Sequence, residues 1–353
     1  MALDNVTPGI RWAITQNSDG QPQLSTIPMP VLEPGTVLVK TRVVALNPSD
    51  YKMGRAFPAP GAVVGCNFAG TIIAIDDSTE TDLFVGDAVC GTLPGSNPGS
   101  PADGAFATYL RVPIMQLIRL DEDSDDMMER AATVGTALAT CTLCFWAEKD
   151  ALNLPATPDQ LAETPFPVLV YGGSTATGTI AIQLLRLSGL DPVATCSPRN
   201  FDLVRSRGAS AVFDYADPHT PAAIKEYTGN RLKYVTFCYS AMARVGGRHT
   251  TLELIPEEVL GKRRSIKTSF VMAYEVDGNG IRLPGRYGKP PDPTKAVKLR
   301  ALFDTCQGLI NSGTLRTHPT RRMKDGFEGV LDGLVLLRSG AVSGIKLVAF
   351  LPD

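Results

Sequence analysis

The stretch Val168-Leu-Val-Tyr-Gly-Gly-Ser-Thr-Ala-Thr-Gly178 decides how the middle of this chain folds. It predicts a short buried strand, a glycine-rich turn and the start of a helix. Such a turn lets backbone N–H groups approach a pyrophosphate, and the helix N-terminus favours its negative charge. Thr175 stands where the dinucleotide-binding fingerprint has its middle glycine. On this motif alone, a glycine-containing turn without a ligand is a competing interpretation.

Strand and helix patterns alternate on the carboxyl side of this turn. The predicted strands lie near 168–171, 192–196, 211–215 and 234–239, and the predicted helices near 175–188, 201–207 and 221–227. This alternation indicates a parallel sheet with crossover helices, and right-handed crossovers make the sheet doubly wound.

The amino-terminal third has a different residue pattern. Runs rich in β-branched residues are separated by Gly and Pro turns at 37–45, 68–75, 88–91 and 105–112. They predict a compact, partly open β-barrel. An amphipathic helix at 295–309 and a closing strand at 345–350 end the chain. The fold class is therefore α/β with two domains, which suits a length of 353 residues.

The composition excludes several classes of function. Lys and Arg number 34 against 36 Asp and Glu, so the net charge is −2 and no nucleic acid partner is expected. No apolar run is long enough to cross a membrane, and no secretory signal is visible. Seven irregularly spaced cysteines indicate reduced thiols in a cytoplasmic protein. Only three histidines are present, so a site that needs several imidazoles is nearly excluded.

The end of the second predicted strand points to the type of dinucleotide. Ser197-Pro-Arg-Asn200 lies 25 residues beyond Gly172, where an NAD site would place an Asp or Glu on the ribose 2′-hydroxyl. A hydroxyl, a cation and an amide suit a 2′-phosphate instead, with Arg199 as the charged partner and Ser197 as a neutral donor. The sequence therefore favours NADPH over NADH.

The chain lacks the residues of a zinc alcohol dehydrogenase. Asn47-Pro-Ser-Asp-Tyr-Lys52 occupies the place of its cysteine ligand, and Gly65-Cys-Asn67 the place of its His-Glu pair. The four-cysteine lobe of a structural zinc is also missing. Cys141-Thr-Leu-Cys144 falls on a predicted buried helix, where we expect core packing and no metal or redox role.

Longer runs carry a resemblance to a known family. Ala45-Leu-Asn-Pro-Ser-Asp-Tyr-Lys52, Val64–Thr71, Val85–Gly91 and Gly104–Tyr109 resemble the zinc-free branch of the medium-chain dehydrogenase/reductase superfamily. Leu169–Thr177, Leu185–Gly189, Ala194–Pro198, Asn200–Leu203, Ser206–Ala209 and Val212–Tyr215 resemble the fungal trans-acting enoyl reductases of polyketide biosynthesis, such as the lovastatin enoyl reductase. The resemblance covers nearly the whole chain.

This resemblance implies a fold and an activity. It implies a GroES-like barrel domain from 1–133 and 276–353, and a Rossmann NADPH-binding domain from 134–275. It implies NADPH-dependent reduction of an α,β-unsaturated acyl chain carried on a partner polyketide synthase, in some cases fused to a peptide synthetase. It also implies a monomer that needs no metal. Proton delivery from solvent is compatible with the sequence.

The resemblance also implies site residues. Lys52 and Thr140 are the catalytic candidates, although Lys52 can equally hold the nicotinamide ribose. The cofactor-binding candidates are Ser49, Asp50, Tyr51, Lys52, Ser174, Thr175, Ala176, Thr177, Ser197, Pro198, Arg199, Asn200, Tyr215, Leu252, Glu253, Val342 and Ser343. The substrate-binding candidates are Thr140, Cys141, Thr142, Leu143, Cys144, Phe145, Trp146, Ala147, Val271, Met272, Ala273, Tyr274 and Glu275.

One departure from the family pattern bears on function. Only Ser240–Val245 separate the strand ending near Tyr239 from Gly246-Gly247, whereas a parallel connection needs about a dozen residues, usually a helix. The family's acidic residue in the preceding strand is also absent, and Phe237 stands near its place. Two interpretations are open. In one, the sheet closes differently and the nicotinamide pocket is intact; in the other, the cofactor site is damaged and the chain is an impaired docking partner of the synthase. A mis-spliced gene would give the same sequence pattern. A stand-alone NADPH reductase of quinones or enones is a further alternative.

Overall fold

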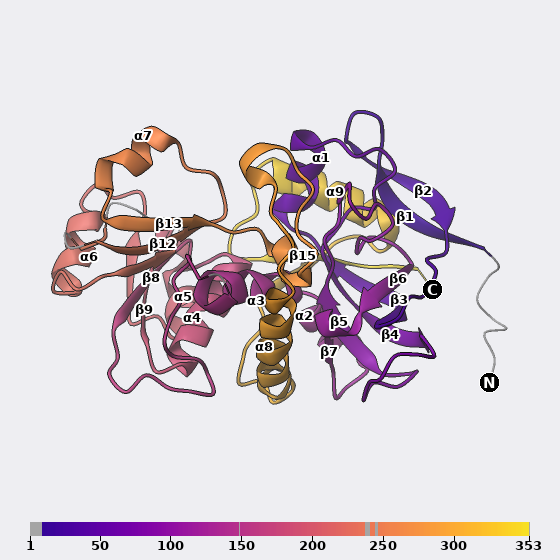
Figure 1. The fold of residues 1–353 in the computed structure, drawn as a ribbon, viewed down its shortest axis with the longest axis horizontal. Helices are drawn as coiled ribbons and strands as arrows, with labels where there is room; N and C mark the ends of the chain where they lie inside the picture. Colours follow the sequence, from indigo (N-terminus) through magenta and orange to yellow (C-terminus); the bar gives the residue numbers. More distant parts are fainter. Residues whose placement is uncertain (1–8, 148, 237–240, 244–245, 353) are drawn as a thin grey trace. The chain divides into compact units, whose positions relative to one another are not determined.

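The computed structural model describes residues 9–147, 149–236, 241–243 and 246–352, and these residues form two compact units (Figure 1). Unit 1 comprises 1–136, 279–292 and 317–353, and unit 2 comprises 137–278 and 293–316. The domain boundaries expected from the sequence differ from this division by three residues each at 134–136 and 276–278, and mainly in assigning 293–316 to the barrel domain. The helix in this stretch packs instead on elements of unit 2, through the contacts described below.

Unit 1 is the predicted partly open barrel. Its main sheet has the order β14-β15-β3-β4-β5-β7, with β6 paired to β3 and a separate β1-β2 hairpin. Its strands are β1 (Ile10–Gln16), β2 (Pro22–Pro28), β3 (Thr36–Ala45), β4 (Asn67–Ile75), β5 (Ala88–Thr92), β6 (Tyr109–Pro113), β7 (Leu117–Arg119), β14 (Thr320–Arg322) and β15 (Lys346–Phe350). Its helices are α1 (Pro48–Ala56), α2 (Asp125–Ala131) and α9 (Gly326–Arg338). Phe68, Phe106 and Leu110 lie in the buried core with Phe327 and Val330 of α9.

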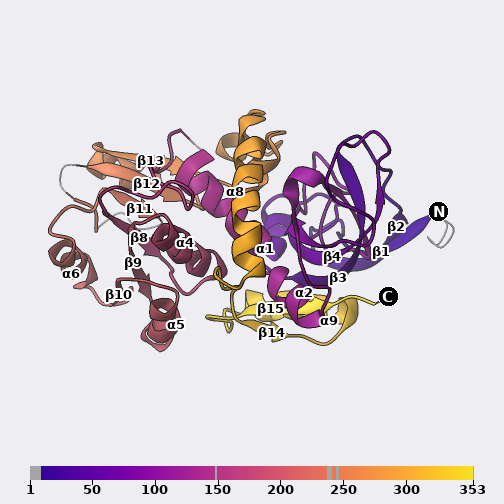
Figure 2. The same ribbon diagram turned by 90° about the horizontal axis from the view of Figure 1, so that it is seen from below.

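Unit 2 is built on a parallel sheet of six strands in the order β10-β9-β8-β11-β12-β13, which Figure 2 shows in this sequence. The strands are β8 (Pro167–Tyr171), β9 (Asp191–Cys196), β10 (Ala211–Asp214), β11 (Tyr234–Thr236), β12 (Gly247–Thr251) and β13 (Ile266–Phe270). The helices are α3 (Gly135–Thr142), which begins at the unit boundary, α4 (Ala176–Leu187), α5 (Phe201–Ser206), α6 (Thr220–Tyr227), α7 (Glu257–Leu260) and α8 (Thr294–Asn311). The predicted doubly wound α/β class is confirmed. The strand order reverses between β8 and β11, and parallel sheets bind ligands at such a switch point, outside the carboxyl ends of the strands.

The shortened connection still yields a parallel strand pair. β12 lies parallel to β11, with Tyr234 opposite Arg248. Of the connecting residues 237–246, the described stretch Ala241–Ala243 is buried and forms no helix. The Ala243 N–H donates to the Leu232 carbonyl at 2.9 Å, so the chain has returned to the amino end of β11 by that point. The position of Phe237 lies outside the described residues.

Candidate functional site

The turn after β8 exposes two unpaired amides at a helix start. Thr175, in place of the usual glycine, is the N-cap of α4: its hydroxyl accepts the Gly178 N–H at 2.9 Å and donates to the Gly172 carbonyl. The Gly172 and Gly173 N–H groups both donate to the Thr195 carbonyl of β9. The first helical residues, Ala176 and Thr177, keep N–H groups without an acceptor among the described residues. These amides can bind a pyrophosphate.

Two glycines of this turn are required by close packing. A Cβ on Gly178 would lie 2.3 Å from the Gly172 carbonyl oxygen, so α4 can approach the turn only at a glycine. A Cβ on Gly173 would lie 2.9 Å from the Cβ of Ala194 in β9. Gly172 has φ of +79°, a conformation that glycine adopts at little cost. The turn therefore has the cradle shape that dinucleotide binding needs.

The residues predicted to bind the 2′-phosphate follow the carboxyl end of the neighbouring strand, β9. Ser197 follows β9, and its hydroxyl lies 3.4 Å from the Tyr215 hydroxyl after β10. The Arg199 side chain is exposed and has no hydrogen bond or ion pair with any described residue. Tyr215 is 50% exposed, and its ring lies 6.1 Å from that of Tyr171. Two neighbouring hydroxyls, with an exposed arginine two residues from Ser197 in the chain, are groups that suit a phosphate monoester.

The carboxyl ends of β12 and β13 bring further candidates to the same sheet edge. Leu252 and Glu253 follow β12, where the Thr251 hydroxyl donates to the Glu253 carbonyl at 2.8 Å. Val271 follows β13, and its N–H donates to the Thr251 carbonyl at 3.0 Å. Because all six strands are parallel, these residues share one edge with the glycine-rich turn.

The predicted acyl-binding segment 140–147 ends in an unusual helix. α3 contains Thr140, which is buried, and continues into a π-helix over Leu143–Ala147. Single π-helical turns often occur at functional sites. The Cys141 thiol lies 3.9 Å from the Thr177 carbonyl oxygen, so this segment packs directly against the start of α4.

The cysteines of this segment are packing residues. Burial raises the pKa of Cys144 and of nearby Cys306 to about 12, and that of Cys141 well above its usual value. All three are therefore thiols at neutral pH, and thiols are poor nucleophiles and metal ligands. The Cys141-Thr-Leu-Cys144 motif accordingly contributes to the core, as its place on a buried helix predicted.

Glu275 has partners inside the protein. Its carboxylate accepts the Met272 N–H at 2.9 Å and pairs with the Lys295 ammonium at 2.6 Å. Both side chains are buried, with 2% of Glu275 and 7% of Lys295 exposed. Direct contact between Glu275 and a substrate stays a prediction, but the pair already gives Glu275 a structural role.

The remaining candidates lie in unit 1. Ser49, Asp50, Tyr51 and Lys52 belong to α1, whereas Val342 and Ser343 belong to the loop between α9 and β15. Lys52 is exposed and Asp50 is buried. The Asp50 carboxylate accepts the Asn47 N–H at 2.6 Å, which caps the start of α1. Whether these residues contact a cofactor stays a prediction.

A buried charge cluster occupies the place of the catalytic zinc ligands. The Lys346 ammonium donates to the Asn47 side-chain oxygen, and the Cys66 thiol lies within hydrogen-bonding reach of Asp50. Burial raises the pKa of Asp50 to about 6 and lowers that of Lys346 to about 8. Among the described residues, no group of three or more His, Cys, Asp or Glu side chains could hold a metal ion. The ammonium of Lys346 is the cation of this cluster.

Comparisons with known proteins identify the family. The chain is 45% identical to trans-enoyl reductase TwmE of Talaromyces wortmannii over 354 positions, which cover 94% of this chain and 96% of the relative. It is 40% identical to trans-enoyl reductase buaC of Petromyces alliaceus, with 99% of both proteins covered. This chain belongs to the trans-enoyl reductase family. The resemblance seen in the sequence is thereby confirmed.

The chain also has the expected domain types. Residues 33–122 match the alcohol dehydrogenase GroES-like domain. The fold is similar to that of CurK enoyl reductase, with a TM-score of 0.71, 16% identity and coverage of 98% and 100%. It is similar to an alcohol dehydrogenase superfamily protein from Novosphingobium aromaticivorans, with a TM-score of 0.74, 19% identity and coverage of 97% and 100%. These two likenesses concern the fold. No described helix of the chain is both long and apolar enough to span a membrane.

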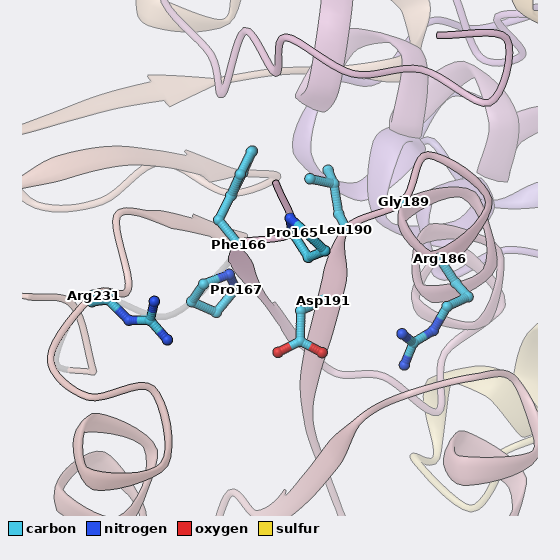
Figure 3. Close-up of a pocket in the computed structure, with 8 residues that line it drawn as sticks. All are labelled: Pro165, Phe166, Pro167, Arg186, Gly189, Leu190, Asp191 and Arg231. Carbon is cyan, nitrogen blue, oxygen red and sulfur yellow. The ribbon is translucent and has the colours of Figure 1, made fainter. Parts of the chain in front are cut away.

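A small cavity in unit 2 lies away from the candidate site. Its volume is about 200 Å³, and Figure 3 shows it at the amino ends of β8 and β9. It is lined by Pro165, Phe166, Pro167, Arg186, Gly189, Leu190, Asp191 and Arg231. Parallel sheets bind ligands at the carboxyl ends of their strands, so this cavity is separate from the glycine-rich turn after β8.

Three lysines that anchor other segments were not predicted from the sequence: Lys346, Lys295 and Lys298. A lysine within the apolar strand Ile345–Phe350 is a usable signal, because a buried ammonium needs a partner. The two lysines of α8 give no such signal, since lysine is ordinary in an amphipathic helix.

Proposed function

We propose that this chain is a trans-acting, NADPH-dependent enoyl reductase, which reduces the α,β double bond of an acyl chain carried on a partner polyketide synthase. The observation that carries the proposal is 45% identity to a trans-enoyl reductase over nearly the whole of both proteins. The glycine-rich turn after β8 supports it, because two amides at the start of α4 are left for a pyrophosphate, and an exposed arginine follows the neighbouring strand β9.

Each part of unit 2 has a proposed task toward the cofactor. The Ala176 and Thr177 amides and the start of α4 hold the pyrophosphate. The Arg199 guanidinium and the Ser197 hydroxyl hold the 2′-phosphate, and the arginine selects NADPH because NADH lacks that group. When bound, NADPH supplies the hydride.

The protein's own donors stabilise the charge that develops on the substrate. Hydride addition forms a C–H bond at the β carbon and moves the π electrons onto the thioester oxygen, after which the α carbon takes a proton. Lys52 and Thr140 are the donors we propose for this oxygen, since a hydrogen bond there lowers the barrier. Solvent can deliver the proton to the α carbon, so no side chain is assigned to that step.

The test compares carrier-bound and free substrates. The purified protein is mixed with NADPH and the cognate synthase whose carrier domain holds an enoyl chain, and loss of NADPH and saturation of the acyl chain are measured. We expect reduction of the carrier-bound chain and little reduction of free quinones or enones. Reduction of the free compounds alone would favour a stand-alone reductase. No NADPH binding at millimolar concentration would favour a docking partner without catalysis.

A further inference from the structure

Helix α8 connects the two segments whose residues, 140–147 and 271–275, are the predicted substrate-binding candidates; as part of the proposed function, we take them to contact the acyl chain. The π-helix Leu143–Ala147 and the short helix Ala273–Asp277 lie beside each other, and both lie beside α8. Leu299 and Cys306 of α8 are fully buried, so this helix is firmly packed within unit 2. It can therefore serve as a rigid support for both segments.

The first connection is the buried ion pair of Lys295. The Lys295 ammonium lies 2.6 Å from one carboxylate oxygen of Glu275, and the other oxygen accepts the Met272 N–H. Met272 follows the carboxyl end of β13 with one residue between them. The carboxylate thus holds the turn after β13 to α8. Because both groups are buried, where an unpaired charge is costly, the pair fixes the position of this turn.

The second connection is made by Lys298, one helical turn along. Its ammonium donates to the carbonyl oxygens of Trp146 and Ala147, at 3.2 and 3.3 Å. The Cys144 and Phe145 carbonyls of the same π-helix accept the N–H groups of Leu152 and Leu154. Lysine near a helix C-terminus commonly satisfies such carbonyls, which lack partners within the helix.

We propose that Lys295 and Lys298 are positioning residues that fix the spacing of the two acyl-contacting segments, and so set the length of acyl chain that the enzyme accepts. This inference rests on the proposed function. Lys295 and Lys298 stand three residues apart on one helix, so a shift of α8 would move both segments together. Neither lysine is proposed to touch the reacting atoms.

The kinetic test uses two soluble substrates, the crotonyl and dodecenoyl thioesters of N-acetylcysteamine. The variants are Lys298→Met and the double variant Glu275→Gln/Lys295→Met, in which both charges are removed and the amide oxygen can still accept the Met272 N–H. We expect the ratio of kcat/KM for the dodecenoyl over the crotonyl substrate to fall about fivefold to tenfold, mainly through KM. The control is Asp304→Asn, which breaks an exposed ion pair with Arg300 on the same helix and should leave the ratio unchanged.

An unchanged ratio of kcat/KM, whether both values are kept or both fall equally, would overturn the inference while leaving the proposed function intact. Hydrogen exchange gives a second measurement that needs no turnover. We expect faster exchange in the peptide 266–278 of the double variant and in 143–156 of Lys298→Met, with the β8–β9 region unchanged. Unaltered exchange in these peptides would also overturn it. A wild-type protein that reduces neither thioester and no carrier-bound chain would instead count against the proposed function.

Discussion

Asp50 illustrates how burial alone changes the chemistry of one residue. Its carboxylate caps α1 and lies near the Lys346 ammonium inside unit 1. Burial disfavours both charges: it raises the pKa of Asp50 to about 6 and lowers that of Lys346 to about 8. Between these values both groups are charged, and each depends on the other for stabilisation.

Lys346→Met should destabilise the protein more at pH 7.5 than at pH 5. Without the ammonium, the pKa of Asp50 rises further above 6 and further above its unfolded value. Such a group contributes stability at pH values below its unfolded pKa, and this stability is lost as the pH rises through the folded pKa. We expect a loss of ~3–5 kcal/mol at pH 7.5, measured by urea unfolding. Lys324→Met, at an exposed ion pair with Glu328, is the control. Equal losses at both pH values would contradict this account.

Arg199 is the residue on which we propose that the choice between NADPH and NADH depends. We expect Arg199→Ala to weaken NADPH binding about tenfold to hundredfold and to leave NADH binding unchanged, because a charge-assisted contact to the 2′-phosphate contributes ~1.5–3 kcal/mol. Titration of cofactor fluorescence measures both affinities. Arg205→Ala is a matched control, since Arg205 is also exposed and pairs with Asp202. A variant that keeps the wild-type preference for NADPH would show that the 2′-phosphate binds elsewhere.

At the scale of elements, the start of α4 depends on how closely a helix approaches a turn. Thr175 replaces the usual glycine of the fingerprint, yet the turn forms because its hydroxyl caps the helix. Gly178 allows the backbone approach that any side chain would prevent. The turn and the helix start therefore form through the Thr175 cap and Gly178, and the middle position of the fingerprint tolerates a threonine.

Gly178→Ala should destabilise the protein by ~1–3 kcal/mol and weaken NADPH binding, because the new methyl group pushes α4 away from Gly172. Thermal unfolding and cofactor titration measure the two effects. Gly308→Ala is the contrasting control: a Cβ there meets no atom within 4 Å, and alanine should stabilise α8 by ~0.5–1 kcal/mol. Unchanged NADPH affinity in Gly178→Ala would argue against a pyrophosphate at this turn.

At the scale of the whole molecule, the open question is whether the shortened connection after β11 impairs the cofactor site. Among the described residues, the sheet continues in parallel order through β12 to β13, so the strand pairing is kept on both sides of the connection. A sheet that keeps this order is compatible with the cofactor site proposed at its carboxyl edge.

NADPH should therefore stabilise the whole protein against unfolding. At a concentration of about 100 times its Kd, a ligand that binds only the folded state adds ~2.7 kcal/mol, and an upward shift of Tm measures this. NADH at the same concentration should give a smaller shift. If neither dinucleotide raises Tm, the chain does not bind the cofactor, and the docking-partner alternative would gain support.

Much of this protein follows from local sequence patterns. The alternation of strands and helices, the glycine-rich turn and Ser197–Asn200 each depend on residues close together in the chain. The doubly wound sheet, and the edge on which the cofactor-binding candidates of unit 2 lie, are therefore predictable. The tertiary structure decided the rest. The contact of Lys346 with Asn47 spans 299 positions, and the pair of Lys295 with Glu275 joins a helix that the sequence had assigned to the other domain. Periodicity reports which face of an element is buried, but only packing determines which distant charge lies opposite.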